Sequence, residues 1–128
     1  MNDLGFTVAI VDDHPFFREV AHKYLTHLGF RVVLEAMNGR ILLDLLESCG
    51  QLPDVCLLDV DMPVMSGYET ARYLRERYPS VKILAMTLLP DDRKKIRILE
   101  AGADLVIGKE SDPLVLKEAL ISAFRVVR

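Results

Sequence analysis

The sequence predicts an α/β fold in which five parallel strands form one sheet with helices on both faces. Short apolar runs alternate along the chain with segments whose apolar residues recur every three or four positions. Strict alternation of strand and helix is typical of parallel sheets. Right-handed crossovers cover both faces only if the chain starts in mid-sheet and then reverses, so we expect the doubly wound strand order 2-1-3-4-5. Because no repeat or linker interrupts the pattern, we expect residues 1–128 to form one domain.

The predicted strands are apolar runs that are too short to be helices. The third is the clearest, because residues 55–58 are all apolar, lie between Pro53 and Pro63, and stop at Asp59. A run without polar alternation indicates a strand that is buried on both of its faces. The complete set of predicted strands covers residues 6–11, 31–36, 55–58, 81–86 and 105–107.

Capping and stop residues bound the predicted helices. Pro15 suits the first helical position of the first helix, which Gly29 ends. Ser66 and Glu69 have the spacing of a capping box and start the third helix, which Pro79 ends. The five helices are therefore expected to start near residues 15, 39, 66, 91 and 112.

The fourth predicted helix runs from Asp91 to Ala101 and stops at Gly102. We expect Ile96 and Leu99 to face inward from it, because they have the three-residue spacing of an apolar helix face.

Composition restricts the class of protein. Apolar residues make up 51% of the chain and charged residues 27%, as in globular proteins. No apolar run has the length of a membrane helix, and residues 1–5 lack the features of a signal peptide, so we expect a cytoplasmic protein without a membrane partner. The net charge of −3 argues against direct nucleic acid binding by this domain. Cys49 and Cys56 lack metal-ligand spacing and are expected to be reduced thiols.

Polar residues follow four of the five predicted strands. Asp12 and Asp13 come after the first strand, Asp59 after the third, Thr87 after the fourth and Lys109 after the fifth. The expected strand order places these four strands side by side, and ligands bind at the carboxyl ends of the strands in open α/β sheets. The three carboxylates, the hydroxyl and the ammonium are therefore expected to face one crevice.

Three carboxylates so close together repel one another and favour a bound cation. Oxygen ligands with room for water and phosphate suit Mg²⁺, and the absence of nearby Cys or His argues against zinc. One carboxylate could then act as a nucleophile toward phosphorus. Lys109 would pair with the transferred phosphoryl group, and the Thr87 hydroxyl would donate a hydrogen bond to it.

These residues resemble the receiver domain of two-component response regulators, which has a flavodoxin-like, CheY-like fold. The resemblance covers nearly the whole chain. The residues around Asp12-Asp13-His14-Pro15 and at the Lys109-Glu110 junction are similar to those in receivers of LuxR-type DNA-binding regulators. The resemblance is based on the segments Val11-Asp12-Asp13-His14-Pro15, Leu57-Leu58-Asp59-Val60-Asp61-Met62-Pro63 with Gly67, Met86-Thr87, and Gly102-Ala103-Asp104 leading to Lys109-Glu110.

The resemblance implies a role for each site residue. Asp59 would accept a phosphoryl group from a sensor histidine kinase or a phosphotransfer protein, in a domain that catalyses only its own phosphorylation and dephosphorylation. Asp13, Asp59 and the backbone carbonyl of Asp61 would bind Mg²⁺, and Asp12 would act through a metal-bound water. Thr87 and Lys109 would bind the phosphoryl oxygens.

The chain departs from the receiver pattern at the place of its output switch. Receivers usually have Tyr or Phe three residues before the lysine, and Val106 stands there. We therefore expect phosphorylation to pull Thr87 inward and reshape the face formed by the fourth helix, fifth strand and fifth helix, without an aromatic lever. The basic cluster at residues 93–97 could make the same face a homodimer surface.

Two alternatives use parts of the same pattern. Haloacid dehalogenase-like phosphatases have a nucleophilic Asp followed two residues later by an acid-base Asp, the spacing of Asp59 and Asp61, but they place this pair near one end of the chain. A flavin or nucleotide site is also compatible with the sheet, although the loop after the first strand is acidic and free of glycine.

Overall fold

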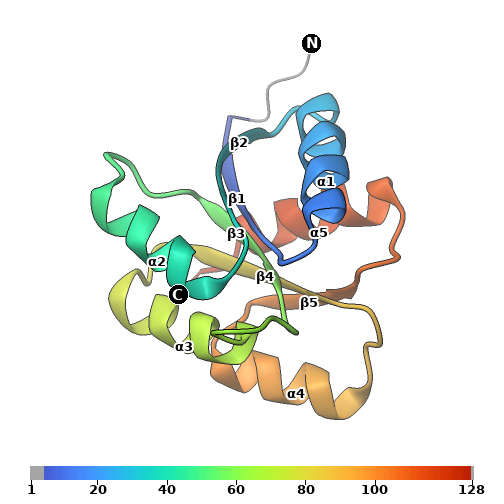
Figure 1. The fold of residues 1–128 in the computed structure, drawn as a ribbon. Helices are drawn as coiled ribbons and strands as arrows, with labels where there is room; N and C mark the ends of the chain where they lie inside the picture. The colour runs from blue at the N-terminus through green and yellow to red at the C-terminus, as the bar shows by residue number, and fades with distance from the viewer. Residues whose placement is uncertain (1–4, 128) are drawn as a thin grey trace.

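The computed structural model describes residues 5–127, which form one parallel sheet covered by helices on both faces (Figure 1). The sheet order is β2-β1-β3-β4-β5, and every pairing is parallel, as the sequence predicts. Met1 to Leu4, used above to judge the absence of a signal peptide, lie outside the described residues. The strands are β1 Thr7–Val11, β2 Arg31–Ala36, β3 Val55–Asp59, β4 Lys82–Thr87 and β5 Leu105–Gly108.

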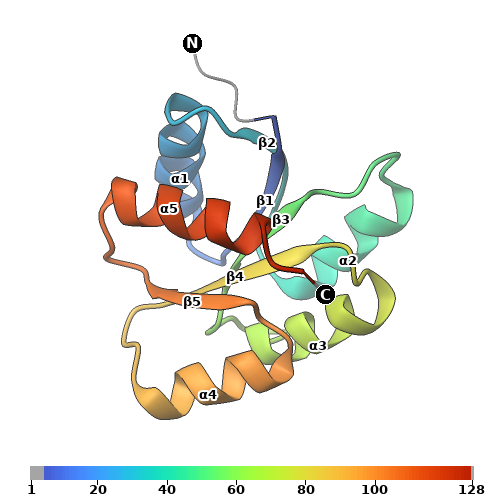
Figure 2. The same ribbon diagram turned by 180° about the vertical axis from the view of Figure 1, so that it is seen from behind.

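The helices divide between the two faces of the sheet. Figures 1 and 2 show α1 and α5 on one face and α2, α3 and α4 on the other. Each layer has its own apolar core, because residues of one strand alternate between the two faces. The helices are α1 Pro15–His27, α2 Gly39–Ser48, α3 Gly67–Arg77, α4 Asp92–Ala101 and α5 Pro113–Phe124.

Strand β3 lies at the centre of the sheet and fixes the position of Asp59. Its first four residues have no exposed surface, and burial of each such side chain contributes about 1.5–3 kcal/mol to folding. Parallel pairing aligns Leu58 with Val11 of β1, and Asp59 with Met86 of β4. The apolar strand thus holds its terminal carboxylate next to the ends of both neighbouring strands.

Local capping places the helix starts where the sequence predicts them. The Ser66 hydroxyl accepts a hydrogen bond from the Glu69 N–H, and the Glu69 carboxylate accepts one from the Ser66 N–H, which completes the capping box of α3. The side chains of Asn38, Asp91 and Asp112 cap α2, α4 and α5 by accepting hydrogen bonds from backbone N–H groups of the first turn.

The orientation predicted for α4 is wrong. Ile96 and Leu99 are 57% and 45% exposed, whereas Ile98 and Ala101 are buried. Ile98 packs into the core that α3 shares with β4 and β5, and this contact sets the rotation of the helix. Four apolar residues within six positions allow two apolar faces, so spacing alone did not decide between them.

No helix within residues 5–127 has the length and apolar character needed to cross a membrane.

Candidate phosphoacceptor and metal site

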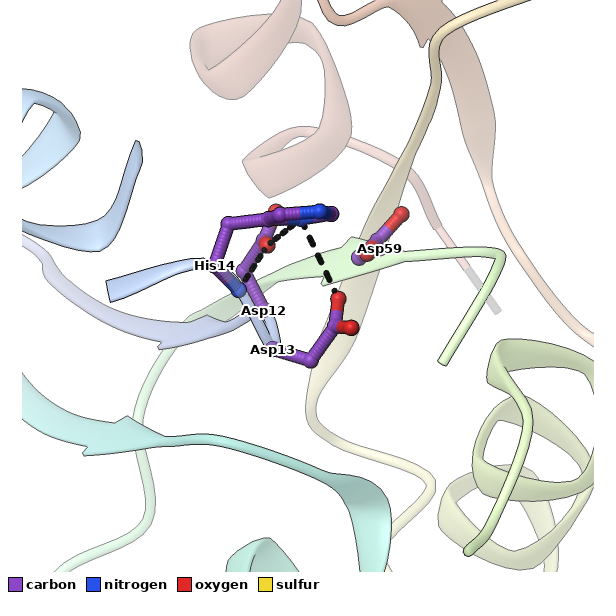
Figure 3. Close-up of side chains that lie close together, drawn as sticks. All are labelled: Asp12, Asp13, His14 and Asp59. Atoms are coloured by element: carbon purple, nitrogen blue, oxygen red, sulfur yellow. Dashed lines mark hydrogen bonds and ion pairs between the residues drawn. The ribbon is translucent and has the colours of Figure 1, made fainter. Parts of the chain in front are cut away.

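The strand ends bring an acidic group together at one edge of the sheet. Asp12 and Asp13 follow β1, and Asp59 ends β3, the neighbouring strand. Asp12 and Asp59 are almost fully buried, at 0% and 2% exposure. Ligand atoms of these three carboxylates and of His14 all lie within 4.8 Å of one another (Figure 3). The predicted convergence of the carboxylates is therefore present in the structure.

Several of these carboxylate oxygens have an ion-pair partner but no well-directed hydrogen bond within the described part of the chain. Among the described residues, Asp12 Oδ2, Asp13 Oδ1 and Asp59 Oδ2 are buried and receive no hydrogen bond of acceptable geometry. Buried polar atoms in folded proteins nearly always have partners, so three such oxygens in one pocket indicate a place for a ligand. An all-oxygen group with this much uncompensated negative charge fits a hard divalent cation such as Mg²⁺.

Lys109 supplies the positive charge inside the pocket. Its Nζ lies 2.6 Å from Asp12 Oδ2 and 3.4 Å from Asp59 Oδ2, and its side chain is only 5% exposed. The ammonium also lies 4.7 Å from the centre of the Phe17 ring, a cation–π arrangement that holds it from the side of α1. One cation thus faces two buried carboxylates, and the pocket retains excess negative charge.

This excess charge changes the acidity of Asp59. Burial, followed by repulsion from the neighbouring Asp12 carboxylate, raises the pKa of Asp59 to about 7, against the opposing effect of Lys109. Without a cation, a proton therefore competes for this carboxylate near neutral pH. A bound cation or a closer approach of Lys109 would favour the ionised form.

The expectation that no histidine lies near the carboxylates is wrong. The His14 Nδ1 lies 3.1 Å from Asp12 Oδ1 and 3.2 Å from Asp13 Oδ1 (Figure 3). The reason is local: His14 is the extended residue before α1, and its N–H donates to Asp12 Oδ1, so the ring folds back over the pocket. Although His14 occupies the cap position of α1, its imidazole makes no capping hydrogen bond.

Thr87 and Asp61 lie at the side of the pocket nearest α4. The Thr87 hydroxyl donates to Asp61 Oδ2 at 3.4 Å, and Lys94 Nζ lies 3.4 Å from the same oxygen. The Asp61 side chain is 57% exposed, and its backbone N–H donates to Asp59 Oδ1. Asp61 is thus adjacent to the acidic cluster through its backbone and connected to α4 through its side chain.

Gly67 allows the start of α3 to approach Asp59. A Cβ built there would collide with the Asp59 carbonyl oxygen and lie 2.6 Å from Val60 Cα. Both are backbone atoms that cannot move aside, so this position requires glycine.

Phe17 and Lys94 make site contacts that the sequence does not specify. Phe17 belongs to an apolar helix pattern that is typical of core packing, and Lys94 belongs to a run of basic residues with no distinguishing feature. Their contacts depend on the rotation of α1 and α4 relative to the sheet, which spacing does not specify.

Comparison with known proteins identifies the family. The model of the response regulator receiver domain matches residues 8–121. The transcriptional regulatory protein DegU of Brevibacillus brevis is 35% identical over 128 residues, which is 99% of this chain and 52% of DegU. The chemotaxis protein CheY of Thermotoga maritima is 32% identical over 118 residues, which is 91% of this chain and 96% of CheY.

A solved structure agrees with these sequence matches. The signal receiver domain of the putative response regulator NarL from Mycobacterium tuberculosis superimposes with a TM-score of 0.87 at 28% identity, covering 99% of this chain and all of that domain. The likeness to DegU and NarL confirms the resemblance to receivers of LuxR-type regulators. The matches support a phosphoacceptor receiver and not the haloacid dehalogenase-like alternative. The chain spans about half the length of DegU.

Proposed function

Because the chain belongs to the response regulator receiver family, we propose that Asp59 is the residue that accepts the phosphoryl group. The observation that supports this most directly is the position of its carboxylate, at the end of the central strand, 2% exposed and 3.4 Å from the Lys109 ammonium. Asp12 is more deeply buried and already pairs with Lys109 at 2.6 Å. Asp59 is therefore the better placed nucleophile.

The proposed donor is a phosphohistidine on a sensor histidine kinase or a phosphotransfer protein. An Asp59 carboxylate oxygen attacks phosphorus and forms a P–O bond, while the P–N bond to the donor histidine breaks. The departing imidazole nitrogen keeps the electron pair of that bond and carries a proton in the neutral product. Lys109 and the Thr87 hydroxyl then hold two of the phosphoryl oxygens. Thr87 would exchange its hydrogen bond to Asp61 for one to the phosphoryl group.

The residues that would hold Mg²⁺ are Asp13, Asp59 and the Asp61 backbone carbonyl, with Asp12 acting through a bound water. Asp13 and Asp59 each have a buried oxygen without a hydrogen bond, which supports this assignment. A bound Mg²⁺ would supply positive charge that keeps Asp59 ionised and neutralises the phosphoryl oxygens.

The proposed output is a change at the face formed by α4, β5 and α5. Thr87 is connected to Lys94 of α4 through Asp61, so movement of the Thr87 hydroxyl toward a phosphoryl group would release that contact. Val106 offers no aromatic ring to transmit the change. The exposed Ile96 and Leu99 of α4 make this face a candidate homodimer surface. Comparison of amide chemical shifts with and without beryllofluoride tests the proposal, and unchanged shifts over residues 90–101 would contradict it.

The wider role is also part of the proposal. The receiver catalyses only its own phosphorylation and dephosphorylation, in the cytoplasm, as one domain over residues 1–128. DegU is named a transcriptional regulatory protein, so we propose that the phosphorylated receiver serves transcription regulation without itself contacting nucleic acid.

Intact mass after incubation with acetyl phosphate tests the assignment of Asp59. We expect one added phosphoryl group on the wild type with Mg²⁺, little without it, and loss of the adduct in hydroxylamine. Asp59→Asn should remain unmodified. Asp54→Asn is the matched control, because Asp54 precedes the same strand at the opposite edge of the sheet and should leave phosphorylation intact. Modification of Asp59→Asn at the wild-type rate would exclude Asp59 as the acceptor.

A further inference from the structure

We propose that His14 is an additional metal ligand. Its imidazole makes the pocket prefer a divalent ion with affinity for nitrogen, such as Co²⁺, over Mg²⁺. The inference rests on the proposed metal site and concerns which ion that site selects. An all-oxygen site would discriminate less, because imidazole is a ligand for transition metals, whereas Mg²⁺ favours oxygen.

The first reason is the position of the imidazole. His14 Nδ1 lies between two carboxylates, 3.1 Å from Asp12 Oδ1 and 3.2 Å from Asp13 Oδ1, and its ligand atom is within 4.8 Å of Asp59 as well. Ligands of an octahedral ion at about 2.1 Å lie about 3 Å apart when adjacent and about 4 Å apart when opposite. Asp13, His14 and Asp59 are therefore close enough to bind one ion with small shifts, with Asp12 bound through a water.

The second reason is the charge of the pocket, an observation independent of the histidine. Asp12 Oδ2 and Asp59 Oδ2 belong to side chains that are at least nine-tenths buried, and both share the Lys109 ammonium as an ion-pair partner without a hydrogen bond of acceptable geometry within the described residues. Both residues belong to the group that includes His14. The pocket thus presents carboxylate oxygens and a ring nitrogen to the same space.

The third reason is that Nδ1 is held at the place where an ion would enter. Nδ1 lies 3.4 Å from Lys109 Nζ, a donor, and 3.1 Å from Asp12 Oδ1, an acceptor. One nitrogen cannot donate to Asp12 and accept from Lys109 at the same time, and the two carboxylate oxygens beside Nδ1 favour the tautomer in which it donates. An entering cation would take the place of that proton: Nδ1 gives up its proton to solvent, Nε2 takes one, and the Nδ1 lone pair then faces the ion.

Calorimetric titration of the purified chain with Mg²⁺ and with Co²⁺ at one fixed pH tests the proposal. The variant is His14→Gln, which keeps a polar side chain and removes the imidazole. We expect it to weaken Co²⁺ binding about tenfold, or about 1.4 kcal/mol, and Mg²⁺ binding less than twofold. His22→Phe is the matched control, because it removes a partly exposed imidazole of α1 that pairs with Glu35 outside the pocket.

Proton NMR of the Co²⁺-loaded protein gives a second readout. We expect strongly hyperfine-shifted imidazole signals in the wild type and in His22→Phe, and their loss in His14→Gln. Equal loss of Co²⁺ and Mg²⁺ affinity in His14→Gln, or unchanged Co²⁺ affinity, would overturn the role of His14 while leaving the proposed Mg²⁺ site intact. If neither ion binds the wild type with an affinity that Asp59→Asn reduces, the metal site itself is refuted, and the inference with it.

Discussion

The carboxylates at the amino ends of the strands and those at the carboxyl ends have opposite roles, and these two sets of strand ends form two opposite edges of the sheet. At the amino ends of the strands, the Asp54 carboxylate accepts from the Thr7 N–H at 2.8 Å, and Asp104 accepts from the Ile83 N–H at 2.7 Å and lies 3.4 Å from Arg75. At the carboxyl ends, the buried carboxylates of Asp12 and Asp59 share the ammonium of Lys109. Carboxylates at the first edge join strands together, whereas those at the second remain available to a ligand.

The difference has a thermodynamic consequence. A buried carboxylate with well-placed donors stabilises the fold, and its removal leaves those donors unpaired. A buried carboxylate that faces other carboxylates opposes folding until a cation or a proton arrives. Substitutions at the two edges should therefore change stability in opposite directions.

The largest effect is expected at the amino-terminal edge. Asp104→Ala should lower the free energy of unfolding by about 2–4 kcal/mol, because the side chain is 4% exposed and its loss leaves the Ile83 N–H and Arg75 without this acceptor. Urea denaturation followed by circular dichroism measures the change. Asp104→Asn retains one acceptor oxygen and should lose about half as much. A neutral effect of Asp104→Ala would remove the distinction between the two edges.

Asp59→Asn should instead stabilise the protein when no divalent ion is present. Neutralising this side chain removes its repulsion with Asp12, and we expect a gain of about 1–2 kcal/mol at pH 7.5 in chelator. Added Mg²⁺ should stabilise the wild type and not the variant. An ion stabilises the folded state only of a protein that binds it, and the variant lacks the Asp59 carboxylate. Destabilisation by Asp59→Asn in chelator would show that the cluster is not under electrostatic strain.

The pH dependence of the free energy of unfolding should differ between the wild type and Asp59→Asn. Asp59 loses its proton near pH 3.8 in the unfolded chain and near pH 7 in the folded one, so the folded state binds more protons between these values. Stability contributed by this group is therefore present at low pH and lost as pH rises toward 7. The gain from Asp59→Asn should be about 1 kcal/mol smaller at pH 5 than at pH 7.5. If the stability difference between Asp59→Asn and the wild type decreased as pH rises, the pKa of Asp59 would not be raised in the folded state.

The sequence correctly predicted which side chains meet at the strand ends. It did not predict which residues of α4 face the core, because the rotation of that helix determines this. Alternating runs gave the strand order, and the rule that parallel strands end at one edge brought Asp12, Asp59 and Lys109 together. The inward residues of α4 were assigned wrongly because Ile96 and Ile98 are equally apolar, and only packing against α3 selects between them. The contact of the His14 ring with the carboxylates is likewise local, because its direction depends on the hydrogen bond from the His14 N–H to Asp12.

The smallest effect is expected at the link between the site and α4. Lys94 Nζ and Asp61 Oδ2 lie 3.4 Å apart at the surface, with side chains 32% and 57% exposed. Exposed ion pairs contribute little, so Lys94→Ala should change the free energy of unfolding by less than about 0.5 kcal/mol. Lys95→Ala, at the next position of α4, is the matched control for helix propensity and charge. The two variants should instead differ in the Thr87 amide chemical shift, because only Lys94 shares an acceptor with the Thr87 hydroxyl. Equal shifts at Thr87 in the two variants would mean that Asp61 does not connect the phosphorylation pocket to α4.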